Sequence, residues 1–460
     1  MSDRYSSAVQ TAVGQAVARR LGLPQPVVLD RWSAGSPVVS GTVVLGTTEG
    51  GRLAHPIERQ LVALGVACRW TLGDGEQAKA LVFDASGVRD VSHLAVLAEF
   101  YQPLLRRLAA SGRIVVVGTP PELADSPTHA VVQRSLEGFS RSLGKELRRG
   151  ATVQLLYVAP GAEAALSSTL AFLLSPRSAY VSGQVVRVGD AASRFGVDTP
   201  AVAAPAVAAP AFDPAAPLRG RVALVTGASQ GIGAATARVL HRDGATVVGL
   251  DVPARASQLM GLAAEVSGDF LALDVTTPDA PHRIGQRLHD RHAGVDVVVH
   301  NAGITRDRRL ANMTRAEWDP VLAVNLAAPL RITEHLLGEG VLRAGGAVVC
   351  VSSIAGIAGN DGQTNYATSK AGVIGLVDAL TPLAAAKGVS VNAVAPGVIE
   401  TQMTAAMPPV VRELGRRMNS LAQGGQPVDV AEAVAWYASA ASAAVTGNVL
   451  RVCGQSLIGA

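Results

Sequence analysis

Residues 221–233 read RVALVTGASQGIG, and this run decides the fold of the second half of the chain. Val222 to Val225 predict a short buried strand, and the glycines that follow predict a tight turn into a helix. Such a turn lets the backbone approach a pyrophosphate at the positive end of the helix dipole. We therefore expect an α/β fold with a dinucleotide at this turn. The turn residues expected to contact it are Gly227, Ser229, Gln230, Gly231, Ile232 and Gly233.

A second predicted strand, residues 246–250, ends in Asp251. A carboxylate at this distance can accept hydrogen bonds from the adenosine ribose hydroxyls, and it repels a 2′-phosphate. The turn itself carries Gln230 and no Arg or Lys. Both observations favour NADH over NADPH, although Asp251 could also be a simple turn former at the end of a strand.

Tyr366 and Lys370 lie four residues apart in the run YATSK, so on a helix they share one face. An ammonium at that position is expected to lower the pKa of the phenol, which can then donate or accept a proton near neutral pH. Ser353, thirteen residues before Tyr366, can hold a substrate oxygen beside it. These groups suit carbonyl reduction or alcohol oxidation. A surface helix pair is the alternative for a Tyr–Lys spacing taken alone.

Further motifs follow in the same order as in one known family: Asp274-Val275, Asn301-Ala302-Gly303, Asn325 and Pro396-Gly397-Val398. With them, the region from about Leu218 to Ala460 resembles the short-chain dehydrogenase/reductase family. The resemblance implies a Rossmann-like, doubly wound parallel sheet in which Asn325 joins Ser353, Tyr366 and Lys370 as a catalytic residue. It also implies that Asp274 and Val275 contact adenine, that Asn301, Ala302 and Gly303 line the cofactor cleft, that Tyr366 and Lys370 bind cofactor, and that Pro396, Gly397 and Val398 cover the nicotinamide. His300 departs from the pattern, since relatives often carry Asn there.

Within this family the chain is similar to the high-molecular-weight 3-oxoacyl-(acyl-carrier-protein) reductases. The similarity rests on 301–307, 362–366, 397–403 and 451–454, and on the length of 460 residues. It implies NADH-dependent reduction of 3-oxoacyl thioesters, carried on acyl carrier protein or CoA, in fatty acid biosynthesis. Another alcohol or ketone (a steroid, sugar or polyketide) remains an alternative because substrate loops vary. A non-catalytic nucleotide-binding scaffold is a second alternative.

The composition indicates large buried cores, with 48% hydrophobic and only 17% charged residues. A net charge of +4 gives no indication of nucleic acid binding, and we expect no membrane span. The three cysteines are scattered without metal-ligand spacing, so we expect no metal and a reducing, cytoplasmic location.

The chain divides into residues 1–198, a Pro/Ala-rich linker at 199–217, and residues 218–460. The first part repeats the strand pattern of the second, for example 41–46 against 220–225 and 180–188 against 444–452. We interpret it as a degenerate, flavodoxin-like or Rossmann-like α/β domain; two unrelated α/β domains are the alternative. Ala130 and Arg134 replace the Tyr and Lys, and Glu49 is placed where a phosphate would sit, so we expect no dinucleotide there. Elements typical of subunit interfaces persist, which predicts a homodimer.

Overall fold

The computed structural model describes residues 3–195, 212–405 and 407–456. Residues 199–211 of the predicted linker lie outside the described residues. The chain forms two compact units. Unit 1 comprises Met1–Arg194, Gly397–Asp429 and Val452–Leu457, and unit 2 comprises Phe195–Pro396, Val430–Arg451 and Ile458–Ala460. Two segments from the second half of the sequence therefore cluster with the first half.

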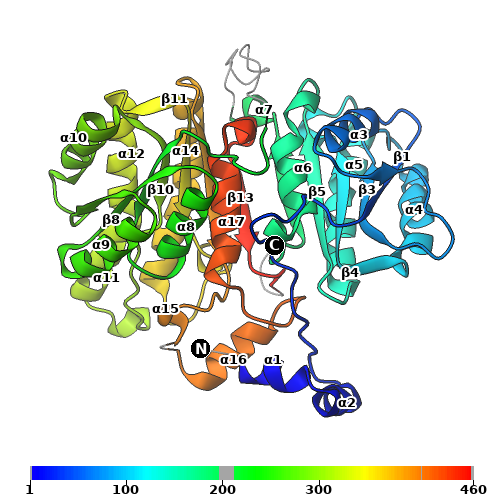
Figure 1. Ribbon diagram of the computed structural model, residues 1–460, viewed down its shortest axis with the longest axis horizontal. Coiled ribbons are helices and arrows are strands. Elements are labelled where there is room, and N and C mark those ends of the chain that lie inside the picture. Colours follow the sequence, from blue (N-terminus) through cyan, green and yellow to red (C-terminus); the bar gives the residue numbers. More distant parts are fainter. Residues whose placement is uncertain (1–2, 196–211, 406, 457–460) are drawn as a thin grey trace. The chain divides into compact units, whose positions relative to one another are not determined.

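Unit 2 is built on a seven-stranded sheet (Figure 1). Its strands are β7 (Val222–Thr226), β8 (Thr246–Asp251), β9 (Asp269–Ala272), β10 (Val295–His300), β11 (Leu342–Val351), β12 (Ser390–Pro396) and β13 (Val449–Val452). They are ordered β13-β12-β11-β10-β7-β8-β9, and the pairings from β12 to β9 are parallel. The chain starts at β7, adds β8 and β9 on one side, and then crosses to β10. Ligands of doubly wound proteins bind at such a switch point, here between β7 and β10.

The core of unit 2 forms where helices cover this sheet. Val297, Val298 and Val299 of β10 are completely buried, as expected of a central parallel strand with both faces covered. The helices α10 (Ala280–His292), α12 (Ala328–Gly338) and α14 (Thr364–Ala385) add apolar side chains to the same cluster. The other helical elements are α8 (Gly231–Arg242), η5 (Pro253–Arg255), α9 (Ala256–Glu265), η6 (Leu310–Asn312), α11 (Arg315–Leu322), the π-helical turn η7 (Ala323–Ala327), α13 (Ile354–Ala358), α17 (Pro427–Ala438) and η8 (Ala440–Ser442).

Unit 1 contains a six-stranded sheet in the order β2-β1-β3-β4-β5-β6, with parallel pairings throughout. The strands are β1 (Thr42–Thr47), β2 (Cys68–Arg69), β3 (Ala78–Asp84), β4 (Leu108–Gly118), β5 (Thr152–Val158) and β6 (Gln184–Val188). This is the flavodoxin-like order. It is also the order of unit 2 with β9 removed, which confirms the prediction of a second α/β fold in the first half of the chain.

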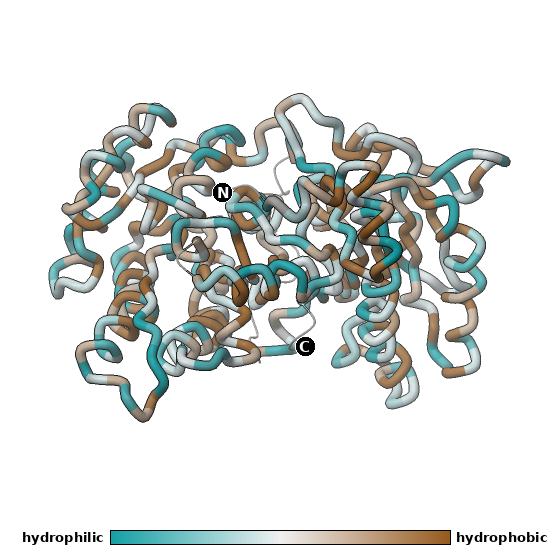
Figure 2. The backbone as a smooth tube through the Cα atoms, turned by 90° about the horizontal axis from the view of Figure 1, so that it is seen from below, coloured by the Kyte–Doolittle hydropathy of each residue, from teal (hydrophilic) through white to brown (hydrophobic). Residues whose placement is uncertain are grey.

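The helices of unit 1 come from both halves of the sequence. From the first half they are α1 (Arg4–Val9), α2 (Ala12–Arg20), α3 (Ala54–Ala63), η1 (Val91–Leu94), α4 (Ala95–Leu105), η2 (Pro121–Leu123), α5 (Pro127–Glu146), η3 (Glu163–Ala165), α6 (Ser167–Leu174), η4 (Pro176–Ser178) and α7 (Ala191–Phe195). From the second half they are α15 (Gln402–Ala405) and α16 (Pro409–Arg417). Hydrophobic and hydrophilic residues alternate along many helices of the chain (Figure 2), as expected where one helix face packs on a sheet.

No helix in the described part of the chain combines the length and the apolar character needed to cross a membrane. Within the same residues, no three His, Cys, Asp or Glu side chains gather in a way that could hold a metal ion.

Candidate active site

The glycine turn joins β7 to α8 in unit 2. Gly227 has a φ of +66°, and a Cβ on it would lie 2.9 Å from the Cα of Ala302. A Cβ on Gly233 would lie 2.0 Å from the carbonyl oxygen of Gly227, so both positions require glycine. Gln230 precedes the first turn of α8 without capping it. The uncapped amides of that turn suit the pyrophosphate of a dinucleotide.

Asn301 ties the end of β10 to this turn. Its Nδ2 donates to the carbonyl oxygens of Thr226 and Gly227, at 3.0 Å each. The hydroxyl of Thr226 accepts from the amides of Asn301 and Ala302 at 3.1 and 3.0 Å. The predicted cleft residues therefore adjoin the predicted turn, across the switch point between β7 and β10.

Asp251 ends β8 and is already engaged by Ser229. Its Oδ2 accepts from the Ser229 amide at 3.0 Å and from the Ser229 hydroxyl at 2.5 Å. Arg255, in η5, donates to the side-chain oxygen of Gln230 at 2.7 Å. Arg255 was not among the predicted site residues, and it brings a positive charge to the turn. Its position only four residues after Asp251 could have indicated in the sequence that it lies near the cofactor turn.

Asp274 and Val275 follow β9 beside the same edge. The amide of Leu273 donates to the carbonyl oxygen of Asp251 at 2.9 Å, which places the two strand ends together. The Asp274 carboxylate accepts from the amide and hydroxyl of Thr276 at 2.9 and 2.8 Å, and Val275 is buried. This geometry gives the strand end a fixed shape next to Asp251.

Tyr366 and Lys370 lie one turn apart near the start of α14, and Ser353 caps the start of α13. The Lys370 ammonium is 5.6 Å from the centre of the Tyr366 ring and donates to the carbonyl oxygen of Val351 at 2.7 Å. The Ser353 side chain lies near enough to Tyr366 to lower the pKa of its phenol. The three predicted side chains are thus brought together in unit 2.

The electrostatics of this group differ from the sequence prediction in one respect. Burial lowers the pKa of Lys370 to about 8. Burial raises the pKa of Tyr366, the Ser353 hydrogen bond acts in the opposite direction, and Asp307 adds to the rise. The predicted lowering of the phenol's pKa was therefore wrong for this arrangement, because desolvation outweighs the hydrogen bond of Ser353.

Asn325 lies in the π-helical turn η7 and is almost completely buried. Its Oδ1 accepts from the Ile304 amide at 2.9 Å, and its Nδ2 donates to the Ile304 carbonyl and the Ser369 hydroxyl at 3.0 Å each. An Asn side chain has two acceptor and two donor positions, so one acceptor position on Oδ1 remains beyond these bonds. Ser369 was missed from the sequence, although it lies three residues after Tyr366. A Cβ on Gly303 would lie 3.3 Å from Oδ1 of Asn325 and 3.5 Å from Nζ of Lys370.

The predicted nicotinamide loop is divided between the units. Pro396 ends β12 in unit 2, whereas Gly397 and Val398 begin a segment of unit 1. The Gly397 amide donates to the Val452 carbonyl at 3.0 Å, and a Cβ on Gly397 would lie 2.7 Å from the Cβ of Cys453. Gly397 is therefore fixed by close packing on the end of β13.

His300 is a buried structural residue. Its Nε2 lies 2.8 Å from the Thr333 hydroxyl, and burial lowers its pKa to about 4. A histidine that is harder to protonate in the folded state than in the unfolded state destabilises the fold as the pH falls from 6.5 towards 4. This cost is absent at higher pH.

We expect His300→Asn to remove part of this acid sensitivity. Between pH 7 and pH 5 the wild type should lose about 1–2 kcal/mol more unfolding free energy than the variant, from linkage at one buried histidine. Urea unfolding at both pH values measures the difference. Equal losses in the two proteins would show that His300 is not the group responsible.

The corresponding turn of unit 1 is occupied by the protein itself. Asp84, at the end of β3, is buried, and its Oδ2 accepts from the amides of Leu53 and Ala54 at 2.7 and 2.9 Å. These amides begin α3, where a pyrophosphate would bind. The sequence assigned the obstructing carboxylate to Glu49; Glu49 is exposed, and Asp84 holds that position. An internal carboxylate at this site disfavours a dinucleotide in unit 1.

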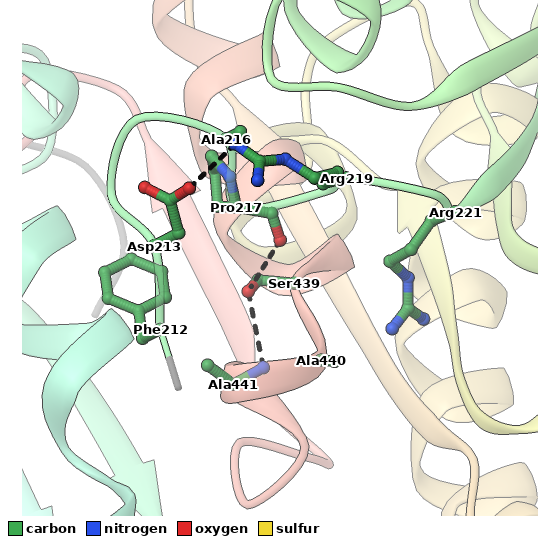
Figure 3. Close-up of a pocket in the computed structure, with 9 residues that line it drawn as sticks. All are labelled: Phe212, Asp213, Ala216, Pro217, Arg219, Arg221, Ser439, Ala440 and Ala441. Carbon is green, nitrogen blue, oxygen red and sulfur yellow. Dashed lines mark hydrogen bonds and ion pairs between the residues drawn. The ribbon is translucent and has the colours of Figure 1, made fainter. Parts of the chain in front are cut away.

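A cavity of about 250 Å³ elsewhere in unit 2 is not the predicted site (Figure 3). Asp213 forms an ion pair with Arg219 at 3.1 Å, and the Ser439 hydroxyl donates to the Pro217 carbonyl at 3.3 Å. The second contact attaches the residues just before β7 to the start of η8. The cavity is lined by Phe212, Asp213, Ala216, Pro217, Arg219, Arg221, Ser439, Ala440 and Ala441.

Comparisons with known proteins each match about half of the chain. The family model described as enoyl-(acyl carrier protein) reductase matches residues 227–454. The 3-oxoacyl-(acyl-carrier-protein) reductase FabG of Thermotoga maritima is 39% identical over 246 residues, covering 52% of this chain and 99% of that protein. Nodulation protein G of Rhizobium sp. strain N33 is 43% identical over 240 residues, covering 52% and 97%. A crystal structure of a dehydrogenase/reductase from Sinorhizobium meliloti 1021 aligns with a TM-score of 0.48 and 32% identity, covering 51% and 94%.

The doubly wound sheet of unit 2 and these similarities define an oxidoreductase of the nicotinamide-dependent, Rossmann-like class. The chain belongs to the short-chain dehydrogenase/reductase family. The family model covers about half of the chain, from the glycine turn after β7 to the end of β13, and includes α14.

Proposed function

We propose that the protein reduces 3-oxoacyl thioesters to 3-hydroxyacyl thioesters with NADH, as a step in fatty acid biosynthesis. The observation that carries the proposal is the grouping of Ser353, Tyr366 and the buried ammonium of Lys370 in unit 2, the unit that carries the glycine turn. The substrate class is supported by relatives named 3-oxoacyl-(acyl-carrier-protein) reductase. We also propose that residues 1–198 form the first α/β domain, that residues 199–217 form a linker and that residues 218–460 form the reductase domain. The proposed assembly is a homodimer.

The proposed mechanism uses the chain to orient the substrate and to supply a proton. NADH, when bound, supplies the hydride that reduces the 3-oxo carbon. Ser353 would donate a hydrogen bond to the 3-oxo oxygen, and Tyr366 would give its proton to that oxygen as the alcohol forms. The raised pKa of Tyr366 keeps the phenol protonated until transfer. Lys370 would stabilise the resulting phenolate, and the remaining acceptor position of Asn325 would hold a water for its reprotonation.

Residues of the turn fit the cofactor. The amides at the start of α8 would hold the pyrophosphate, Asp251 would accept from the adenosine ribose, and Asp274 and Val275 would lie beside the adenine. The Ser229 hydroxyl and amide already hold the Asp251 carboxylate in place. A carboxylate held in this way opposes a 2′-phosphate, because two like charges 4 Å apart repel by about 1 kcal/mol in water and more at a partly buried site.

We expect the wild type to prefer NADH over NADPH by at least about tenfold in kcat/KM, which corresponds to about 1.4 kcal/mol. Asp251→Ala should reduce the difference in kcat/KM between NADH and NADPH, because Arg255 can then pair with the 2′-phosphate of NADPH. Asp251→Ala combined with Arg255→Ala is the matched control and should lose the gain with NADPH. A wild type that uses NADPH better at equal concentration would contradict the assignment of Asp251.

The proposed substrate class is tested by NADH oxidation with acetoacetyl-CoA, longer 3-oxoacyl-CoA thioesters and the same acyl groups on acyl carrier protein. Turnover of these thioesters at rates well above those with steroid, sugar or polyketide ketones is the expected result. Turnover only of another ketone class would support the alternative dehydrogenase function. NADH binding without turnover of any ketone would support a non-catalytic scaffold.

A further inference from the structure

Tyr366 lies in the first turn of α14, and the amides of a first helical turn have no partner within the helix. Gln363, which precedes the helix, makes no side-chain bond that caps it. The amide of Tyr366 donates instead to Oδ1 of Asn365 at 2.7 Å. Asn365 is completely buried, and it was not among the predicted site residues. The backbone that carries the phenol is thus held by the side chain that precedes it in the sequence.

The other end of the Asn365 side chain holds two distant segments of unit 2. Its Nδ2 donates to the carbonyl oxygen of Arg306, after β10, at 2.9 Å and to that of Glu317, in α11, at 2.8 Å. Both N–H groups are therefore used, and one buried amide joins three stretches of chain around Tyr366. Such an amide fixes geometry, because a displacement would leave desolvated polar groups without partners.

The loop of residues 301–309, here called the β10 loop, lies beside the start of α14. The Asp307 carboxylate accepts from Nε2 of Gln363 at 2.8 Å. Asp307 also lies near enough to Tyr366 to raise the pKa of its phenol. The loop that Asn365 holds is therefore adjacent to the reacting hydroxyl.

We propose that Asn365 is a positioning residue that fixes the phenol of Tyr366 against the β10 loop for proton transfer to the substrate. The inference rests on the proposed function above, because it concerns the same proton donor. The phenol must come within hydrogen-bond distance of the reacting oxygen, and a displacement of about 1 Å can cost about 100-fold in rate. Asn365 acts through the backbone of Tyr366 and takes no part in the transfer itself.

Asn365→Ala removes all three hydrogen bonds and is tested in the full-length chain. We expect kcat for acetoacetyl-CoA to fall about 10-fold to 100-fold, while the KM of the thioester and the NADH dissociation constant stay within about threefold. Turnover is counted per NADH-binding site, measured by fluorescence titration, so that unfolded protein does not contribute. The solvent deuterium isotope effect on kcat should rise, because proton transfer then limits the rate.

Asn392→Ala is the matched control. Asn392 is also completely buried in unit 2, donates to the Val445 carbonyl at 2.7 Å and accepts from the Asn448 amide at 3.0 Å, but it lies in β12. Its removal should lower the urea midpoint of unfolding in the same sense as Asn365→Ala, and leave kcat per site and the isotope effect unchanged. Equal falls in kcat in the two variants would overturn the proposal, since they would report only a loss of stability.

A double-mutant cycle with Tyr366→Phe tests whether Asn365 acts through the phenol. Once the hydroxyl is absent, Asn365→Ala should lower the residual kcat by less than about twofold, because residues that act through one group are not additive. A further loss as large as that in the wild-type background would overturn the proposal.

Asn365→Asp is the isosteric second variant if Asn365→Ala does not fold. A buried carboxyl group keeps an acceptor for the Tyr366 amide and, when protonated, one donor, so kcat should fall in the same sense but by less. Unchanged kcat in every folded Asn365 variant would overturn the proposal. The comparison uses whichever ketone the wild type reduces, so turnover of another ketone class would contradict the thioester assignment and still test the positioning. No turnover of any ketone would overturn both.

Discussion

Tyr366→Phe is expected to slow thioester reduction by roughly two to four orders of magnitude, the range for losing a general acid. The ring stays, so packing at the start of α14 is preserved. The lost group is the phenol hydroxyl, whose pKa is influenced by Ser353. NADH binding should persist within a few fold, because the turn and Asp251 are untouched. Steady-state kinetics and NADH fluorescence titration measure the two quantities on the same preparation.

Tyr437→Phe is the control for a general effect of removing a phenol from unit 2. Tyr437 is completely buried in α17 and is not among the predicted site residues. Its turnover should stay close to that of the wild type. Near-normal turnover of every substrate by Tyr366→Phe would rule out the proposed proton donor.

Lys370→Met is expected to reduce turnover by roughly 10²–10³-fold, the range for removing one electrostatic contribution to a developing charge. Methionine keeps a long unbranched side chain but removes the ammonium that donates to the Val351 carbonyl. The loss should appear in kcat for the thioester. Retention of more than a tenth of wild-type kcat would contradict the role assigned to Lys370.

The pKa of Lys370 adds two expectations on pH. Because burial holds this pKa at about 8, wild-type reduction should decline as the pH rises through 8 and the ammonium loses its proton. A lysine whose pKa is lower in the folded state costs stability below pH 8, and this cost disappears as the pH rises towards the ordinary value of 10.5. Lys370→Met should therefore resist urea at pH 7 at least as well as the wild type.

The main lines of the fold could be predicted because they follow from local patterns. Runs such as Val297 to Val299 are apolar throughout, which is typical of parallel strands buried on both faces, and each is bounded by turn residues. The repeat of such runs in the first half predicted the second sheet. The two-residue strand β2 and the absence of a described counterpart of β9 could not be predicted. Strands that short carry no periodic signal, and their pairing depends on β1 beside them.

In the candidate site too, the features that depend on local sequence could be predicted, and those that depend on distant contacts could not. Positions on one turn or one helix face, such as Gly227 to Gly233 and Tyr366 with Lys370, could be read from spacing. The direction of the Tyr366 pKa could not, because it depends on burial by elements distant in sequence. The membership of residues 397–429 in unit 1 was also unpredictable, since it rests on contacts such as that of Tyr180 with Gln423, 243 positions apart.

The buried carboxylate of Asp84, at the end of β3 in unit 1, can be compared with the side chain of Asn301, which follows the corresponding strand β10 in unit 2. The two side chains differ in one functional group: the amide of Asn301 donates to the carbonyl oxygens of Thr226 and Gly227, whereas the carboxylate of Asp84 accepts from the amides at the start of α3. An acid at the end of this strand satisfies the helix start from within and makes a bound anion unnecessary for folding. Within this chain, the residue at this strand end thus distinguishes the glycine turn of unit 2 from the turn of unit 1, which is filled by the protein's own carboxylate.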